Sequence, residues 1–177
     1  MHSYFQWITR DVSNLVNGCF FVVTFVYGLN IFTGCQTLWH YLLGHAIAFL
    51  SKSWLILRDF NDIMSTSNKC GGDLTWHRHL NNFGNYVYAA KLVKVPYSVL
   101  KYTWHNSQHS RGIIIEKLDW IFGNSCWFST WPFIFFSIQV YCCSMFTLPY
   151  YVIRRINSLV VFLYKDYSLS HLGAKIA

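Results

Sequence analysis

The sequence predicts an all-α membrane protein of three or four helices, with a polar middle loop and one interfacial helix. Three observations predict this fold class. Hydrophobic residues make up 54% of the 177 residues, whereas charged residues make up 12%, about half their usual share in soluble domains. The mean hydropathy is positive, at +0.27. Long intervals of the chain carry no charge, as expected of segments that cross a hydrocarbon core.

The first two spans are expected in the N-terminal third of the chain. No charged residue separates Asp11 from Lys52, and about 20 apolar residues are enough to cross a bilayer as a helix. This interval is too long for one straight helix, and Gly34 is a natural break within it. We therefore expect one span at residues 15–33 and a second at residues 36–57.

The remaining elements follow from the alternation of polar and apolar segments. Residues 58–119 are expected to form a polar and interfacial region, with a Gly-Gly turn at 71–72 and an interfacial helix within 83–100. The stretch from Trp120 to Ile153 has no formal charge, so a third span is expected at about 126–150. A short tail, 156–177, completes a single membrane domain over residues 1–177.

The excess of positive charge is concentrated in the middle of the chain. The net charge is +7, which could suggest a nucleic-acid partner. However, the basic residues gather between Lys52 and Lys117, where a membrane protein would place them beside anionic headgroups. We therefore expect membrane lipid or an acyl chain as a partner, and no nucleic acid.

The histidines are the candidate metal ligands. Six of the eight come in close pairs, and ionisable side chains in or beside a membrane mark function. Imidazole suits iron or copper, and two residues spaced i, i+4 can share one face of a helix. The alternative for each pair is a hydrogen-bonded histidine at the interface. The six candidate ligands are His40, His45, His77, His79, His105 and His109.

Short motifs around these histidines resemble the membrane acyl-CoA (delta-9) fatty acid desaturases. The segment His40-Tyr-Leu-Leu-Gly-His45 is similar to the first histidine box of that family, and Asp73-Leu-Thr-Trp76-His77-Arg78-His79 is similar to the second. Further downstream, His105-Asn106-Ser107, then Arg111-Gly112 and Trp120, follow the order of a third conserved region. The resemblance covers about residues 37–168, as short fragments in the same order.

The resemblance implies an endoplasmic reticulum protein in which two non-haem irons act on an acyl chain. Leu80 and Asn81 stand where two histidines of the second box would be, and the last box is absent. We therefore expect a degenerate, desaturase-like integral membrane protein that is not catalytic alone. If a metal site remains, His40, His45, His77 and His109 are expected to point toward a common interior region.

Two alternatives belong to other functional classes. The first is a small structural or haem-binding subunit of a larger, respiratory-type complex in the mitochondrial inner membrane. There His40 would ligate haem, and Gly44 would let the porphyrin approach the helix. The second is a helical anchor whose polar middle binds other membrane subunits.

Overall fold

The chain folds mainly into β-sheets, so the predicted all-α membrane fold is wrong. The computed structural model describes residues 6–13, 20–73, 82–99, 101–108, 112–132, 134–143, 146–155, 158–163 and 175–176. It divides into two compact units. Unit 1 contains residues 1–94 and 101–130, and unit 2 contains residues 95–100 and 131–177.

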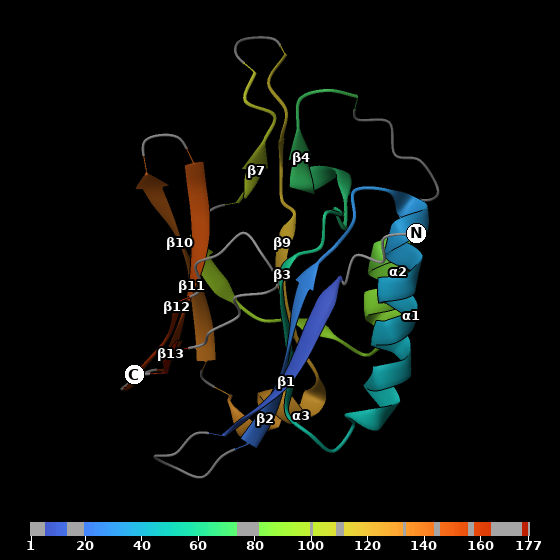
Figure 1. The fold of residues 1–177 in the computed structure, drawn as a ribbon, viewed down its shortest axis with the longest axis vertical. Coiled ribbons are helices and arrows are strands. Elements are labelled where there is room, and N and C mark those ends of the chain that lie inside the picture. The colour runs from blue at the N-terminus through green and yellow to red at the C-terminus, as the bar shows by residue number, and fades with distance from the viewer. Residues whose placement is uncertain are drawn as a thin grey trace. The chain divides into compact units, whose positions relative to one another are not determined.

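A five-stranded sheet forms the centre of unit 1, with the strand order β1-β2-β3-β9-β5. Strands β2 and β3 are parallel, and the other neighbours in this sheet are antiparallel. Figure 1 shows helices α1 and α2 side by side along one face of this sheet. The elements are β1 (Trp7–Ser13), β2 (Phe20–Tyr27), α1 (Phe32–Ala48), β3 (Trp54–Asp59), α2 (Asn82–Ala89), β5 (Val93–Lys94) and β9 (Asp119–Gly123).

The β2–α1–β3 segment is a βαβ unit, because a helix connects two neighbouring parallel strands. Strand β2 reads FFVVTFVY, and these aromatic and β-branched residues favour the extended state. In α1, the buried side chains recur at helical spacing, so that one face packs on the sheet. That face consists of Cys35, Leu38, Trp39 and Leu42.

Aromatic rings fill the core between the helices and the sheet. Phe83 of α2 has no exposed surface, and its ring stacks on Trp39 with centroids 4.8 Å apart. It also contacts Phe60 at 5.2 Å and meets Trp120 and Phe122 edge to face, each at 6.0 Å. Offset and edge-to-face rings add to the free energy gained by burying their area.

A small three-stranded sheet, ordered β4-β8-β7, completes unit 1 with two short helical turns. Its strands are β4 (Lys69–Cys70), β7 (Trp104–His105) and β8 (Ile115–Glu116), and the turns are η1 (Thr66–Asn68) and α3 (Ser125–Thr130). After β4 the chain turns at Gly71 and Gly72, both with positive φ. The Gly-Gly turn expected from the sequence is therefore confirmed.

Unit 2 is a second sheet, with the strand order β13-β12-β11-β10-β6. Strands β10 and β11 form a long antiparallel pair, and β6 pairs with β10 in parallel. The strands are β6 (Tyr97–Val99), β10 (Ile134–Cys143), β11 (Phe146–Arg155), β12 (Ser158–Leu163) and β13 (Lys175–Ile176).

None of the three predicted spans is a long helix. The span expected at 15–33 contains β2, the one at 36–57 contains part of α1 followed by β3, and the one at 126–150 contains α3, β10 and part of β11. Within the described ranges, no helix has the length and apolar character needed to cross a membrane. The predictions of an integral membrane desaturase and of its endoplasmic reticulum or mitochondrial location are therefore wrong. The interfacial helix expected within 83–100 is the short α2, followed by β5 and β6.

Candidate functional site

Polar residues gather where the parallel strands β2 and β3 end. Ligands of α/β sheets bind beyond the carboxyl ends of parallel strands. Here β3 ends at Asp59, and Asn61 and Asp62 follow it. Gly28, which follows β2, donates its N–H to the carbonyl of Asp59 at 2.7 Å. A Cβ at Gly28 would collide with the backbone of Phe60. The lack of a side chain therefore lets the two strand ends approach closely.

Two aspartates face each other at this edge. Asp59, the last residue of β3, is the register partner of Asp119, the first residue of β9. Directly opposite residues of an antiparallel pair place their Cβ atoms about 4.5–5.5 Å apart on the same face, and like charges there are destabilising. Asp59 is half-buried, and Asp119 is 6% exposed. The sheet therefore holds two carboxyl groups together with little access to water.

Asn61 fixes the position of the Asp59 carboxyl group. Its backbone N–H donates to Asp59 Oδ1 at 2.9 Å, and its side-chain Nδ2 donates to the carbonyl of Gly28 at 2.6 Å. Asn61 has a φ of 49°, and Arg58 has a φ of 107°. Non-glycine residues in this region cost free energy and cluster at functional sites. The backbone on both sides of Asp59 is therefore strained where it orients the carboxyl group.

Thr103 holds the other aspartate from the backbone side. Its hydroxyl oxygen accepts hydrogen bonds from the N–H groups of Leu118 and Asp119, both at 3.1 Å. The N–H of Thr103 itself donates to the carbonyl of Glu116 at 2.9 Å. The start of β9, and with it the Cα of Asp119, is thus fixed to the segment that precedes β7.

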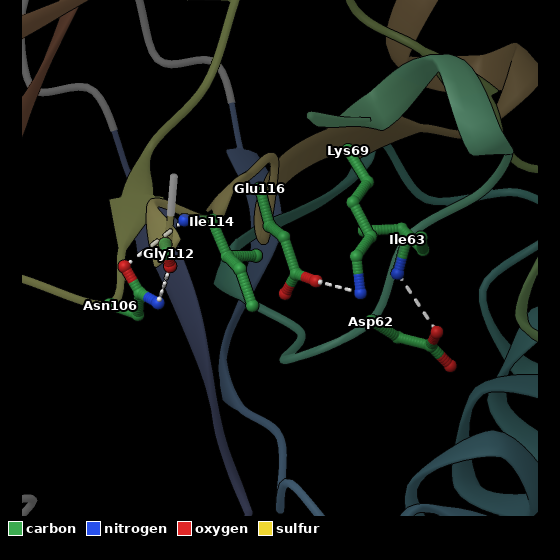
Figure 2. Close-up of polar contacts among 7 residues, drawn as sticks. All are labelled: Asp62, Ile63, Lys69, Asn106, Gly112, Ile114 and Glu116. Atoms are coloured by element: carbon green, nitrogen blue, oxygen red, sulfur yellow. Dashed lines mark hydrogen bonds and ion pairs between the residues drawn. The ribbon is translucent and has the colours of Figure 1, made fainter. Parts of the chain in front are cut away.

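Three charged residues, Asp62, Lys69 and Glu116, come from the loop after β3, from β4 and from β8. Figure 2 shows the side chains of Lys69 and Glu116 pointing toward each other, with Lys69 Nζ 3.1 Å from Glu116 Oε1, whereas the Asp62 carboxyl group points to the N–H of Ile63. Asp62 accepts a hydrogen bond from the N–H of Ile63 at 2.8 Å through Oδ1. Its backbone carbonyl accepts one from Trp120 Nε1 at 2.9 Å. The contact with Trp120 anchors the loop after β3 to strand β9.

The β7–β8 loop next to this group is closed by Asn106. Its Nδ2 donates to the carbonyl of Gly112 at 2.8 Å, and its Oδ1 accepts from the N–H of Ile114 at 3.1 Å (Figure 2). The backbone N–H of Asn106 also donates to the carbonyl of Ile114. This asparagine therefore defines the geometry of the loop, which the sequence had suggested as part of a desaturase motif.

The electrostatics of the site keep both loop aspartates partly protonated near neutral pH. Burial, with a further contribution from the charge of Asp119, raises the pKa of Asp59 to about 7. Burial also raises the pKa of Asp62 to about 7, and the charge of Glu116 adds to this effect. Hydrogen bonds from the N–H groups of Asn61 and Ile63 oppose these shifts in pKa. Groups with pKa values near the working pH are suited to proton transfer.

The predicted metal ligands are not among the residues of this site, and three of them lie outside the described residues. His40 is exposed and His45 is half-buried on α1, and in each ring Nδ1 contacts the carbonyl four residues earlier, at 2.7 and 3.0 Å. His105 is exposed on β7. His77, His79 and His109 lie outside the described residues. The expected convergence of His40, His45, His77 and His109, and the iron or haem site, therefore stay predictions.

The sequence analysis missed the aspartate site because it assigned residues 36–57 to a helix. The available signal was the apolar run WLIL followed at once by Arg58, Asp59, Asn61 and Asp62. Polar residues directly after a short β-type run predict a strand that ends at a site. The second half of the site, Asp119, begins another apolar run, and only the pairing of the two strands brings the aspartates together.

Comparisons with known proteins do not assign a family. No protein-family model matches the sequence, and no curated protein matches it. Among solved structures, the chain is similar to a crystal structure of beta toxin (275-280) from Staphylococcus aureus, with 11% sequence identity and a TM-score of 0.47. The match covers 81% of this chain and 52% of that chain, so this chain spans about half the length of the toxin chain. A likeness at this level does not establish a common function. The function proposed below therefore rests on the residues of the site alone.

Proposed function

We propose that this chain is a hydrolytic domain in which Asp59 and Asp119 bind one divalent cation that acts on a phosphate ester. The observation that carries the proposal is the direct opposition of the two carboxyl groups at the carboxyl edge of the β2–β3 pair. Two carboxylates held together in a largely buried position repel each other. A bound cation would remove this repulsion and stabilise both ionised groups.

The chemistry of the donors favours a hard cation such as Mg²⁺. Mg²⁺ is usually bound through one or two carboxylates, several waters and substrate phosphate oxygens, rather than by a complete cage of protein ligands. This agrees with the finding that the described residues contain no group of three or more His, Cys, Asp or Glu side chains that could hold a metal. A site with two carboxylates would therefore be completed by water and substrate.

The protein side chains have separate roles in this proposal. Asp59 and Asp119 are the cation ligands, and Asn61 is a positioning residue because its N–H fixes Asp59 Oδ1. A cation bound there would polarise a phosphoryl oxygen and lower the pKa of a bound water. Asp62, with a pKa raised to about 7, is a group that could take up a proton near neutral pH.

The experiment measures Mg²⁺ binding by calorimetry and hydrolysis of bis(p-nitrophenyl) phosphate with the full chain at pH 7.5. Asp119→Asn should reduce both cation affinity and rate by more than the roughly 10- to 100-fold typical of outer-shell partners. Asp11→Asn, at an exposed position on β1, is the matched control and should change neither. Asp119→Asn should remain folded, because it removes one of two repelling charges. Equal Mg²⁺ affinity in the wild type and Asp119→Asn would refute the cation site.

In a second candidate function, the two carboxyl groups share one proton and act as general acid and base without a metal. The pKa of Asp59 near 7 favours this candidate. The two candidates differ in what Mg²⁺ does. If a cation binds, it must lower the pKa of Asp59, and activity must depend on its concentration. If the proton is shared, activity must persist in a chelator and follow the ionisation of Asp59.

A further inference from the structure

Two lysine side chains converge on one indole ring in unit 1. Lys117 Nζ lies 4.6 Å from the centroid of Trp120, and Lys94 Nζ lies 5.3 Å from the same centroid. Lys94 is in β5, next to β9 in the sheet, and Lys117 comes two residues before β9 begins. The strands therefore bring together two cations that are 23 positions apart in the sequence.

This cluster lies on the other face of β9 from the aspartate pair. Asp119 and Trp120 are consecutive residues of one strand, so their side chains point to opposite faces. The Trp120 ring stacks with Phe122 and meets Phe83 of α2 edge to face, which places it on the helix side of the sheet. The two lysines therefore belong to a different place in the fold from the Asp59–Asp119 pair.

The two lysines differ in their access to water. Lys117 is 5% exposed, whereas Lys94 is exposed. Burial and the charge of Lys94 lower the pKa of Lys117 to about 8, and the charge of Asp119 opposes both effects. The face of the Trp120 ring attracts both ammonium groups.

We propose that Lys94, Lys117 and Trp120 form a binding site for a small oxyanion of the phosphate type. Lys94 would provide the outer contact at the surface and Lys117 the inner one, with Trp120 holding both side chains in place. Ammonium groups form strong, charge-assisted hydrogen bonds to phosphate oxygens. This site does not depend on the proposed hydrolytic activity.

The test titrates inorganic phosphate into the full chain in the presence of a chelator, at low ionic strength and near pH 8. Lysine side-chain NMR should show a saturable response of the Lys94 and Lys117 signals. Tryptophan fluorescence gives a second readout, summed over the eight tryptophans. Lys94→Gln and Lys117→Gln should each weaken phosphate binding at least tenfold. Lys52→Gln, an exposed lysine over the Phe49 ring, is the matched control and should leave binding unchanged.

Three results would overturn the anion site. These are a response that does not saturate, an equal response to chloride at matched ionic strength, or an equal loss of binding in Lys52→Gln. If Lys117→Gln does not fold, the exposed Lys94→Gln decides the question alone. Because the titration contains no divalent cation, its failure leaves the Mg²⁺ proposal untouched. Likewise, loss of Mg²⁺ binding in Asp119→Asn says nothing against phosphate binding by the lysines.

Discussion

The polar groups buried at the two ends of strand β3 have opposite surroundings. At the amino end, Asn124 is 8% exposed, and its side chain satisfies four backbone groups. Its Oδ1 accepts from the N–H groups of Trp54 and Trp127, and its Nδ2 donates to the carbonyls of Phe49 and Lys52, at 2.8–3.1 Å. At the carboxyl end, two carboxyl groups face each other and repel.

This difference separates a structural polar residue from a candidate functional one. A buried polar group that makes all its hydrogen bonds stabilises the fold and fixes neighbouring elements. Asn124 connects the end of α1, the start of β3 and the start of α3 in this way. The Asp59 carboxylate contributes no comparable stability, since burial and the like charge of Asp119 raise the pKa of Asp59.

The largest expected effect on stability is at the amino end of β3, where Asn124 lies. Asn124→Ala would leave two N–H groups and two carbonyls without their partner, and each unsatisfied buried group costs about 1–3 kcal/mol. We expect the free energy of unfolding to fall by at least about 3 kcal/mol, measured by urea denaturation. The matched control is Asn85→Ala on an exposed position of α2, which should change stability by less than about 0.5 kcal/mol. Equal effects of the two variants would contradict the comparison.

The pH dependence of stability reports on the carboxyl groups at and after the carboxyl end of β3. The unfolded chain loses the protons of Asp59 and Asp62 near the ordinary pKa of 3.8, whereas the folded chain keeps them until about pH 7. The native state therefore binds more protons between these values, and stability falls as pH rises from about 4 to about 7. Each carboxyl group should contribute on the order of 2–4 kcal/mol, since one pKa unit corresponds to about 1.4 kcal/mol.

Lys117 adds the opposite trend at higher pH. Its pKa is about 8 in the folded chain and 10.5 in the unfolded chain, so the unfolded state binds more protons between these values and stability rises again. Stability should therefore have a minimum between about pH 7 and pH 8. Urea denaturation across pH 4–10 measures this profile. Asp59→Asn should reduce the fall in stability between about pH 4 and pH 7. An unchanged profile in that variant would contradict the raised pKa of Asp59.

The smallest expected effect concerns the ion pair beside the site. Lys69 and Glu116 have side chains that are 22% and 20% exposed, and partly exposed pairs of this kind contribute about 0–1 kcal/mol. Lys69→Met should therefore lower the free energy of unfolding, measured by urea denaturation, by less than about 1 kcal/mol. A loss of several kcal/mol would mean that the small sheet depends on this pair.

The sequence could predict some local features of this chain because they depend on nearby residues. The turn at Gly71 and Gly72 follows from the freedom of glycine to adopt positive φ. The helical segment of α1 falls partly within the expected helix at 36–57, since its apolar residues recur with helical spacing. The segment that becomes β2 was assigned to a membrane span, although its aromatic and β-branched residues favour a strand.

Composition by itself determined that the chain buries long apolar segments, and it determined little about what covers them. A parallel strand buried on both faces has the same continuous apolar run as a membrane helix. Only strand pairing distinguishes the two, because backbone groups of a strand find their partners in distant segments. The same pairing places Asp59 opposite Asp119 and Lys94 beside Trp120. The tertiary structure therefore decided both candidate sites, since each is assembled from residues that the sequence keeps far apart.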